Sequence, residues 1–583
     1  MSPPGSGAVI GYEPDEPCPP LVALGVGLQG VILVLASIVS IVAVTARATD
    51  QDAVHLTWAV FACLVISGAL TALQAGRFGW LGAGHVQITG PTPIYLGVSV
   101  LALAAGGPAL LATLTGVAAL FYLVLSLWLP RLRRIVTPVL SGTVIMLIAV
   151  TVLPIALDGV NEVPGTAPAA AGPVVALVTL TALVVLSLWV SGPWRIWTPL
   201  IAVAGGCTVA ALFGAYDTGQ IRAAAWVGLP AGGFTGPGLT FGVDFWALLP
   251  AFVVVALVGV IENIGDSVAI QQISWRKPRV TDFRRVQGTL NLNALGVLLS
   301  GLAGSPPTTV YASSSQSLIH FTGVAARRVG YAIGALLVAL SLLPKVTAVI
   351  MSIPAPVTGA YVLAAIGLLF VSGIQSVVSD GLDRRKALAV GVAFFLGVGL
   401  DNRTFGTDLL GETWGPLIDS GLLVGALAAV LITRFMAWTD RSRRARIQVD
   451  LHRSAAGEID GFLRGFASDI GWNEAAGQRL RSAGEETLMS LLQLGDDRAA
   501  GDTRRLIVLA RRSGGAVEME FLATLDEENL QDRLADLNDE PRSTTGVEDG
   551  AIPLGLLGHH ASAVRHQKFH GFDVVTVRVT EPS

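Results

Sequence analysis

The chain has 583 residues, of which 52% are hydrophobic and only 14% charged, and its mean hydropathy is +0.64. This composition excludes an ordinary soluble protein, and the net charge of -4 gives no reason to expect a nucleic-acid partner. Cys18, Cys63 and Cys207 are scattered without the spacing of metal ligands. We therefore predict no disulfide framework, no metal site and no cofactor.

Composition divides the chain into two parts. Long apolar runs end near residue 438, and an ordinary polar sequence follows. We predict an all-α polytopic membrane domain over 21–438, in contact with lipid, and a soluble α+β domain over 455–583. A cytoplasmic segment, 1–20, precedes the first span, and a basic linker, 439–454, joins the two domains.

Apolar runs long enough to cross about 30 Å of hydrocarbon predict fourteen transmembrane spans. The spans are 21–46, 54–76, 86–106, 108–130, 135–156, 171–191, 198–215, 245–271, 287–304, 307–325, 329–349, 354–377, 385–401 and 416–438. The third and tenth are crowded with Pro, Gly, Ser and Thr, in HVQITGPTPIYLGV and GSPPTTVYASSSQSLIHF. Paired interruptions of this kind are typical of a transporter's binding site, and a separation of seven spans favours a 7+7 inverted repeat.

Basic residues are distributed unequally between alternate loops. Fifteen lie in or beside loops after even-numbered spans, namely Arg77, Arg131, Arg133, Arg134, Arg195, Arg276, Lys277, Arg279, Arg284, Arg285, Arg327, Arg328, Arg384, Arg385 and Lys386. Four follow odd-numbered spans, namely Arg47, Arg222, Lys345 and Arg403. Because Lys and Arg accumulate in cytoplasmic loops, we predict a multi-pass inner-membrane protein with both termini in the cytoplasm.

One apolar span carries two carboxylates. The stretch 256–285, ALVGVIENIGDSVAIQQISWRKPRVTDFRR, places Glu262 and Asp266 one helical turn apart, and we expect Gly265 to let another backbone approach closely. A carboxylate at bilayer depth costs about 2.5–3.5 kcal/mol, so it requires a partner, a water-filled cavity or a bound solute. This pattern favours a transport site. The alternatives are a polar contact between helices or a position near the membrane interface.

Several stretches resemble the nucleobase-ascorbate transporter family, the xanthine and uracil permeases. They are VIENIGDSVA (260–269), TPVLSGTVIMLI (137–148), GSPPTT (304–309) with FTGVAARRVG (321–330), and SIPAPVTGAYVLAAIGLLFVSGI (352–374). The resemblance implies fourteen helices in core and gate domains, an elevator-like movement, proton or sodium symport and a homodimer through the gate domains. Substrate would lie between the interrupted third and tenth spans.

The resemblance assigns the two carboxylates. Glu262 matches the glutamate that hydrogen-bonds the nucleobase, and Asp266 matches the acid one turn later. A carboxylate is a suitable acceptor for the N–H donors of a purine or pyrimidine, and it can also take up a proton during a transport cycle. We therefore expect both residues in substrate binding and in proton coupling.

The chain departs from the family's pattern in three places. In the tenth span the family's amide or acid and its glycine are replaced by Ser314 and neighbouring residues, so Ser313 and Ser314 compete for the substrate-facing position and Gln316 supplies an amide. In the first span, Gln29 is followed by glycine where the family usually has histidine. In the third span the chain has Pro93, followed by Ile94, at a position that often offers a backbone N–H, and proline has none to donate. These six positions complete the predicted substrate site.

His320, in the tenth span, is a candidate for proton coupling. The alternative is a histidine that is hydrogen-bonded between packed helices.

The soluble domain has helical and strand patterns. Residues 474–493 predict a helix, RRLIVLARR and GAVEMEFLA a hairpin, and DVVTVRV a last strand. This order of a helix, two strands, a polar loop and a last strand resembles that of the ATPase domain of anti-sigma factors and histidine kinases. In this resemblance PLGLLGHHASAV is the glycine-containing segment that leads into a helix. Ser490 stands where that family has its magnesium-holding Asn, and the Asp-x-Gly triplet is missing. We predict a degenerate fold that regulates or docks a cytoplasmic partner, with ATP binding the lesser alternative.

These features predict a secondary transporter, not an enzyme, which carries a purine or pyrimidine nucleobase, most simply with protons. An anion carrier of the same architecture is the first alternative, although a carboxylate at the site repels an anion. A membrane sensor that signals through its soluble domain is the second.

Overall fold

The structure, a computed structural model, describes most of the chain. It covers residues 10–47, 53–127, 138–164, 167, 168, 170–190, 194, 197–216, 219–230, 238–276, 281–379, 384–400, 408, 421–439, 444–494, 505–513, 516–523, 561, 563–569 and 572–580. The chain forms two compact units. Unit 1 is Met1–Ser274 with Arg285–Ala437, and unit 2 is Trp275–Arg284 with Trp438–Ser583.

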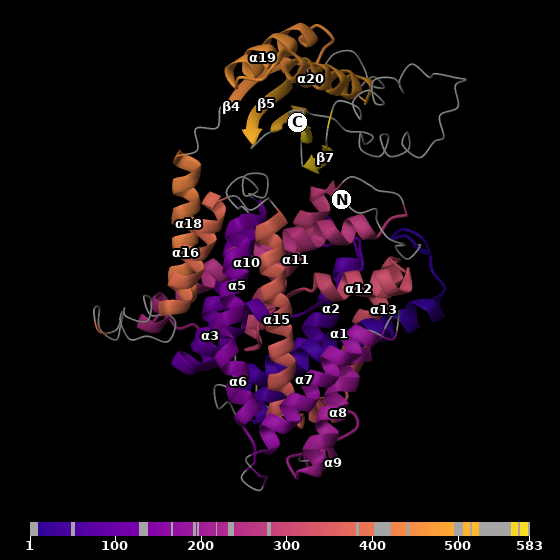
Figure 1. Cartoon of the computed structure of the whole chain (residues 1–583). Helices are drawn as coiled ribbons and strands as arrows, with labels where there is room; N and C mark the ends of the chain where they lie inside the picture. Colours follow the sequence, from indigo (N-terminus) through magenta and orange to yellow (C-terminus); the bar gives the residue numbers. More distant parts are fainter. Residues whose placement is uncertain are drawn as a thin grey trace. The chain divides into compact units, whose positions relative to one another are not determined.

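Unit 1 is helical, as its apolar runs predict (Figure 1). Its longer helices are α1 (Pro20–Arg47), α2 (Ala53–Ala75), α3 (Leu96–Leu127), α5 (Pro138–Thr151), α6 (Leu153–Asn161), α7 (Ala171–Trp189), α8 (Thr198–Leu212), α10 (Val243–Ile273), α11 (Phe283–Leu302), α12 (Ala312–Thr322), α13 (Arg327–Ser341), α14 (Pro344–Met351), α15 (Ala355–Ser379), α16 (Arg384–Leu400) and α18 (Gly421–Thr439). A short helix, α9 (Gly219–Ala223), follows α8.

Six described helices are long and apolar enough to cross a membrane, and seven if α13 and α14, which meet at 84°, form one span. Other helices are broken or shorter. The chain leaves helical geometry at Gly106 and at Gly107, whose positive φ of 65° suits glycine, at the boundary between the third and fourth predicted spans. The structure thus confirms a polytopic membrane fold, and the count of fourteen spans stays a prediction.

Short strands interrupt two of the predicted spans. β1 (Thr89–Pro91) precedes a 3-10 turn, η1 (Pro93–Tyr95), and α3, whereas β3 (Thr308–Val310) precedes α12. The strands pair antiparallel, with Gly90 opposite Thr309. Because the strands are neighbours, the starts of α3 and α12 are brought together inside unit 1. The interruptions predicted from the Pro, Gly, Ser and Thr content are therefore present.

Pairs of glycines let helices pack closely in unit 1. A Cβ added at Gly142 of α5 would lie 2.4 Å from the Gly373 carbonyl oxygen of α15, and one added at Gly68 of α2 would lie 2.8 Å from the Gly334 carbonyl oxygen of α13. Small residues at such contacts are typical of helices that pack in a membrane. These contacts hold α15 against α5 and α13 against α2.

Unit 2 is a six-stranded sheet with two helices on one face (Figure 1). The strand order is β2-β7-β8-β6-β5-β4, and the bounds are β2 (Thr281–Asp282), β4 (Arg444–Asp450), β5 (Arg505–Ser513), β6 (Ala516–Ala523), β7 (Ala563–Phe569) and β8 (Phe572–Thr580). The helices are α19 (Ala455–Asp469) and α20 (Glu474–Leu494). Apolar side chains at helical spacing and at alternate strand positions meet in one core.

The described elements of unit 2 agree in part with the sequence. The helix predicted over 474–493 is α20, and the predicted hairpin is β5 and β6, which pair antiparallel. Strand β4 lies within 439–454, where we predicted a linker, and pairs with β5 along its whole length. Residues 563–569 form strand β7, whereas the segment 553–560 lies outside the described residues.

Candidate functional site

A cavity of about 650 Å³ lies between the starts of α3 and α12 and the faces of α10 and α15. Pockets that hold small molecules have volumes of about 300–1,000 Å³. The polar side chains that line the cavity are Thr92, Ser187, Glu262, Asp266, Tyr311, Ser314, Gln316, Tyr361, Ser372 and Gln375. Five residues predicted from the sequence are among the lining residues, namely Pro93, Glu262, Asp266, Ser314 and Gln316.

Helix α10 supplies both carboxylates. Glu262 and Asp266 lie one turn apart on the same helix face, and both line the cavity. The adjacent Asn263 faces elsewhere, because its amide donates to the Tyr122 hydroxyl of α3 at 2.8 Å and to the Gly259 carbonyl at 2.7 Å. Packing of α10 against α3 and α12 thus directs the two carboxylates into the cavity.

A buried hydroxyl and amide network fixes α10 to two other elements. Thr289 Oγ1 of α11 donates to Gln87 Oε1 at 2.9 Å, and Gln87 Nε2 donates to Ser267 Oγ of α10 at 3.3 Å. The hydroxyl oxygens of Ser267 and Thr289 are 3.1 Å apart. Ser267 follows Asp266 directly, and Gln87 lies two residues before β1. The network therefore holds Asp266 and the interrupted strand in a fixed relation.

Helix α12 supplies the hydroxyl and amide side of the cavity. Ser314 and Gln316 line the cavity, and the Ser315 hydroxyl between them is used by the backbone. Ser315 Oγ accepts from the Ile88 N–H at 2.9 Å and donates to the Tyr311 carbonyl at 2.6 Å. Of the two serines that competed for the substrate-facing position, Ser314 lines the cavity. The side chain of Ser313 lies outside the described part of the chain.

The start of α3 forms a less polar side. Thr92, Pro93 and Leu96 line the cavity, and Pro93 begins η1 without an N–H to donate. The Thr92 N–H is directed to the Pro307 carbonyl at 2.9 Å. Ile94, which we predicted to contact substrate, is 3% exposed and is not among the cavity's lining residues.

Three further expectations do not match the cavity. Gln29 is not among its lining residues; at 1.5 Å per residue it lies about 18 Å along α1 from Ile41, the lining residue of that helix. His320 is exposed in the last turn of α12, with its ring beside Phe321. A Cβ at Gly265 would meet no described atom within 4 Å, so no described backbone approaches there as we had expected.

The polar groups of α15 were not predicted from the sequence. Tyr361, Ser372 and Gln375 lie on one helix and line the same cavity as the carboxylates. Tyr361 and Ser372 fall within the stretch SIPAPVTGAYVLAAIGLLFVSGI (352–374) that carries the family resemblance, but this motif does not indicate which face of the helix meets the cavity. Only the packing of α15 beside α5 and α7 turns this face toward α10.

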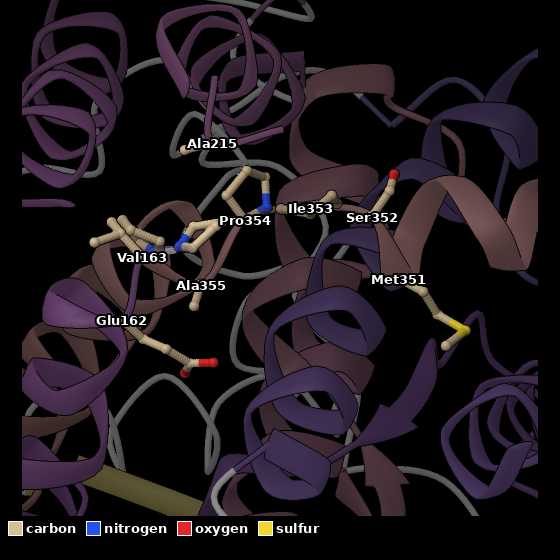
Figure 2. A pocket seen from close by; sticks show the side chains of 10 residues that line it. Glu162, Val163, Ala215, Met351, Ser352, Ile353, Pro354 and Ala355 are labelled. Carbon is tan, nitrogen blue, oxygen red and sulfur yellow. The ribbon is translucent and has the colours of Figure 1, made fainter. Parts of the chain in front are cut away.

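A second, smaller cavity of about 320 Å³ has fewer polar side chains in its lining (Figure 2). Its lining includes Glu162, Ser352 and the prolines Pro164, Pro354 and Pro356. The Ser352 hydroxyl is 3.3 Å from that of Tyr216, and Glu162 is exposed. This cavity lacks the several converging polar groups of the larger one, which is the better candidate site.

The larger cavity offers both hydrogen-bonding and apolar groups. Carboxylates accept, hydroxyls donate and accept, and the Gln316 and Gln375 amides do both. Tyr311 and Tyr361 add aromatic surface, and Leu96 and Leu369 add apolar surface. Within the described ranges, no cluster of His, Cys, Asp and Glu could hold a metal ion. Such a lining suits a small polar solute.

Comparison with known proteins gives the family. Residues 23–403 match the model of the xanthine and uracil permeases, described as a permease family. Xanthine permease XanP of Escherichia coli (strain K12) is 26% identical over 400 residues, which cover 66% of this chain and 84% of that protein. Uric acid permease PucJ of Bacillus subtilis (strain 168) is 24% identical over 444 residues, or 73% of this chain and 94% of that protein.

Among solved structures, the murine anion transporter Slc26a9 in an inward-facing state matches with a TM-score of 0.49 at 13% identity, over 74% of this chain and 70% of that one. The family assignment does not depend on this similarity. The match over residues 23–403 covers most of the chain and includes both carboxylates and both interrupted segments. The chain is therefore a membrane transport protein that belongs to the permease family of the xanthine and uracil permeases.

Proposed function

We propose that the protein is a secondary transporter of an oxopurine nucleobase, with xanthine and uric acid as the first candidates. The relatives named above are permeases for these two solutes. The observation that carries the proposal is the cavity in which Glu262 faces the polar start of α12. The carboxylate can accept from adjacent purine N–H groups, while Gln316 can donate to a ring carbonyl.

The lining discriminates between solute classes. Two carboxylates, Glu262 and Asp266, border the cavity, and none of its described lining residues is Lys or Arg. A fully ionised inorganic anion such as sulfate would be repelled here, because like charges in a low-dielectric site interact strongly. Uric acid is an anion at neutral pH, so it would enter this cavity only together with a proton, whereas xanthine can enter as the neutral base. The anion carrier therefore remains the weaker alternative.

Proton symport and an elevator-like movement complete the proposal. Glu262 and Asp266 lie one turn apart and can exchange a proton with the cavity, whereas His320 lies away from it. We place the protein in the inner membrane, with fourteen spans as a 7+7 repeat, both termini in the cytoplasm and two copies joined through the gate domains. Unit 2 would then be a cytoplasmic regulatory domain.

The experiment is uptake of labelled xanthine, uric acid, uracil and sulfate into proteoliposomes containing the full chain. We expect uptake of an oxopurine, driven by an inward proton gradient and abolished by a protonophore. Loss of this uptake in Glu262→Gln, with the variant still folded, supports the site. Uptake of sulfate alone would favour the anion carrier, and oxopurine binding without flux would favour the sensor.

A further inference from the structure

One loop of the permease part belongs structurally to unit 2. Residues Trp275–Arg284 lie between α10 and α11 in the chain, yet they cluster with Trp438–Ser583. Within unit 2, β2 pairs parallel with β7, and the register is Thr281 opposite Gln567 and Asp282 opposite Lys568. A loop inside the family match, residues 23–403, therefore completes a sheet that is otherwise built from residues beyond that match.

This pairing is a tertiary contact, not a result of chain adjacency. The other strand pairs of the sheet, from β4 to β8, are antiparallel, and only β2 joins in parallel. Without β2, strand β7 would be an edge of the sheet with one row of unpaired backbone groups. Addition of an extended segment to such an edge is a common mode of peptide recognition.

The docked strand is tied directly to a transmembrane helix. β2 ends at Asp282 and α11 begins at Phe283, so no residue of slack separates them. The Asp282 carboxylate accepts from the Arg284 N–H at 3.0 Å and from Arg284 Nε at 3.3 Å, which fixes the first turn of α11. The loop therefore enters α11 in one defined direction.

Helix α11 in turn contacts the elements of the candidate site. Its Thr289 joins Gln87 and Ser267 in the buried network described above. Ser267 is on α10, which carries both cavity carboxylates and enters the same loop after Ile273. Strand β2 is therefore joined directly to α11, which the buried network connects to the helix that carries the cavity carboxylates.

We propose that the β7 edge of unit 2 is a docking site for the α10–α11 loop, and that docking restrains the transport cycle. Unit 2 thus acts on its own permease by strand addition. The effect on transport rests on the proposed function, whereas the docking contact does not.

A cysteine pair tests the docking. In a chain with Cys18, Cys63 and Cys207 changed to Ser, Thr281→Cys is combined with Gln567→Cys. Directly opposed residues in a sheet present their side chains on the same face, whereas a shift of one residue moves a side chain to the other face. The matched control is therefore Thr281→Cys with His566→Cys. We expect mild oxidation to cross-link the first pair and not the control, and absence of a cross-link in the first pair would overturn the docking.

Two substitutions at one position test the restraint. Thr281→Val retains a strand-forming side chain and Thr281→Gly does not, and the span of β propensity corresponds to about a fivefold change in pairing. We expect hydrogen exchange at residues 563–569 and 285–295 to be about fivefold faster in Thr281→Gly than in Thr281→Val, and xanthine uptake to be faster as well. Equal exchange in the two variants contradicts the restraint.

The oxidised, cross-linked protein tests the restraint in the opposite direction, because its loop cannot leave the β7 edge. We expect its xanthine uptake to fall several-fold and to return on reduction, with xanthine affinity unchanged. Equal uptake before and after reduction would overturn the regulatory effect while the cross-link still supports docking. If wild type neither binds nor carries an oxopurine, the proposed function fails. Cross-linking and exchange at 285–295 then still decide whether docking holds the loop.

Discussion

Carboxylates occur on apolar-faced helices in both units, and their surroundings differ. On α10 in unit 1, Glu262 and Asp266 border a cavity of about 650 Å³ with eight other polar lining residues. On α20 in unit 2, Glu486 is partly buried and its neighbour Glu485 is exposed. The nearby hydroxyls differ in the same way. Ser267 bonds to neighbouring elements, whereas Ser490 donates to the Glu486 carbonyl of its own helix at 2.7 Å.

The difference shows which surroundings would let a carboxylate on a helix bind a solute. A polar side chain on a helix satisfies itself locally unless other elements bring partners and open space to it. Helices α12 and α15 bring both to α10. For α20, the hydroxyl that stands at the place of a magnesium-holding Asn is 1% exposed and bonded to its own backbone. The degenerate ATPase-like module stays a prediction.

The largest expected effect is on transport in Glu262→Gln. Hydrogen bonds to a charged group contribute about 1.5–3 kcal/mol, so loss of the charge should weaken oxopurine affinity about 10- to 100-fold. Uptake and thermal stabilisation by xanthine measure the change. The matched control is Glu485→Gln on α20, which should leave both unchanged. If Glu485→Gln reduced xanthine uptake and stabilisation as much as Glu262→Gln does, the carboxylates of α10 would not differ in function from those of α20.

Next in size is the contrast between Ser267→Ala and Ser490→Ala. Removing Ser267 leaves Gln87 and Thr289 without one partner in a buried network, and each such buried group costs about 1–3 kcal/mol. Removing Ser490 deletes only a bond within one helix and should change stability by less than about 1 kcal/mol. Thermal unfolding of the purified full chain gives the comparison, and a larger loss in Ser490→Ala would contradict it.

A smaller effect is expected for Gln316→Ala. A neutral hydrogen bond contributes about 0.5–1.5 kcal/mol, so oxopurine affinity should fall about 2- to 10-fold. Ser317→Ala, on the next residue of α12 and not among the cavity's lining residues, is the control. Titration with xanthine measures both, and an unchanged affinity in Gln316→Ala would place the substrate elsewhere.

The smallest effect concerns pH and Glu486. Partial burial, and then the Glu485 carboxylate, raise the pKa of Glu486 from 4.5 to about 7 in the folded state. Between these values the folded state binds the proton and the unfolded state does not, so stability is full below pH 4.5 and falls as the pH rises to about 7. Glu486→Gln should flatten this dependence.

Local opening of α20, measured by hydrogen exchange between pH 4 and 8 and corrected for intrinsic rates, checks the expectation. Above pH 7 we expect α20 to be better protected in Glu486→Gln than in wild type. The opposite order at pH 8 would contradict the raised pKa. Glu485→Gln should show only a small change, because that side chain is exposed.

The features that could be predicted from the sequence were those that depend on local periodicity and composition. Glu262 and Asp266 were placed on one face by their spacing, and the interruptions at residues 89–91 and 308–310 followed from Pro, Gly, Ser and Thr content. By contrast, Gln29 and Ile94 were assigned from motif position alone, and the structure puts neither at the cavity. Tyr361 and Gln375 were missed because a helix turned toward a cavity has no separate local signature.

The membrane fold, the family and the carboxylate pair could be predicted from local sequence, because hydropathy, helix period and motif spacing act over a few turns of one chain segment. The contribution of α15 to the cavity and the pairing of residues 281–282 with the sheet of unit 2 depend on contacts between distant segments. The two strands β2 and β7 are separated by almost half the chain, and such pairing depends on which surfaces fold against one another. Backbone hydrogen bonds across a sheet edge require complementary extended segments and leave little trace in side-chain pattern.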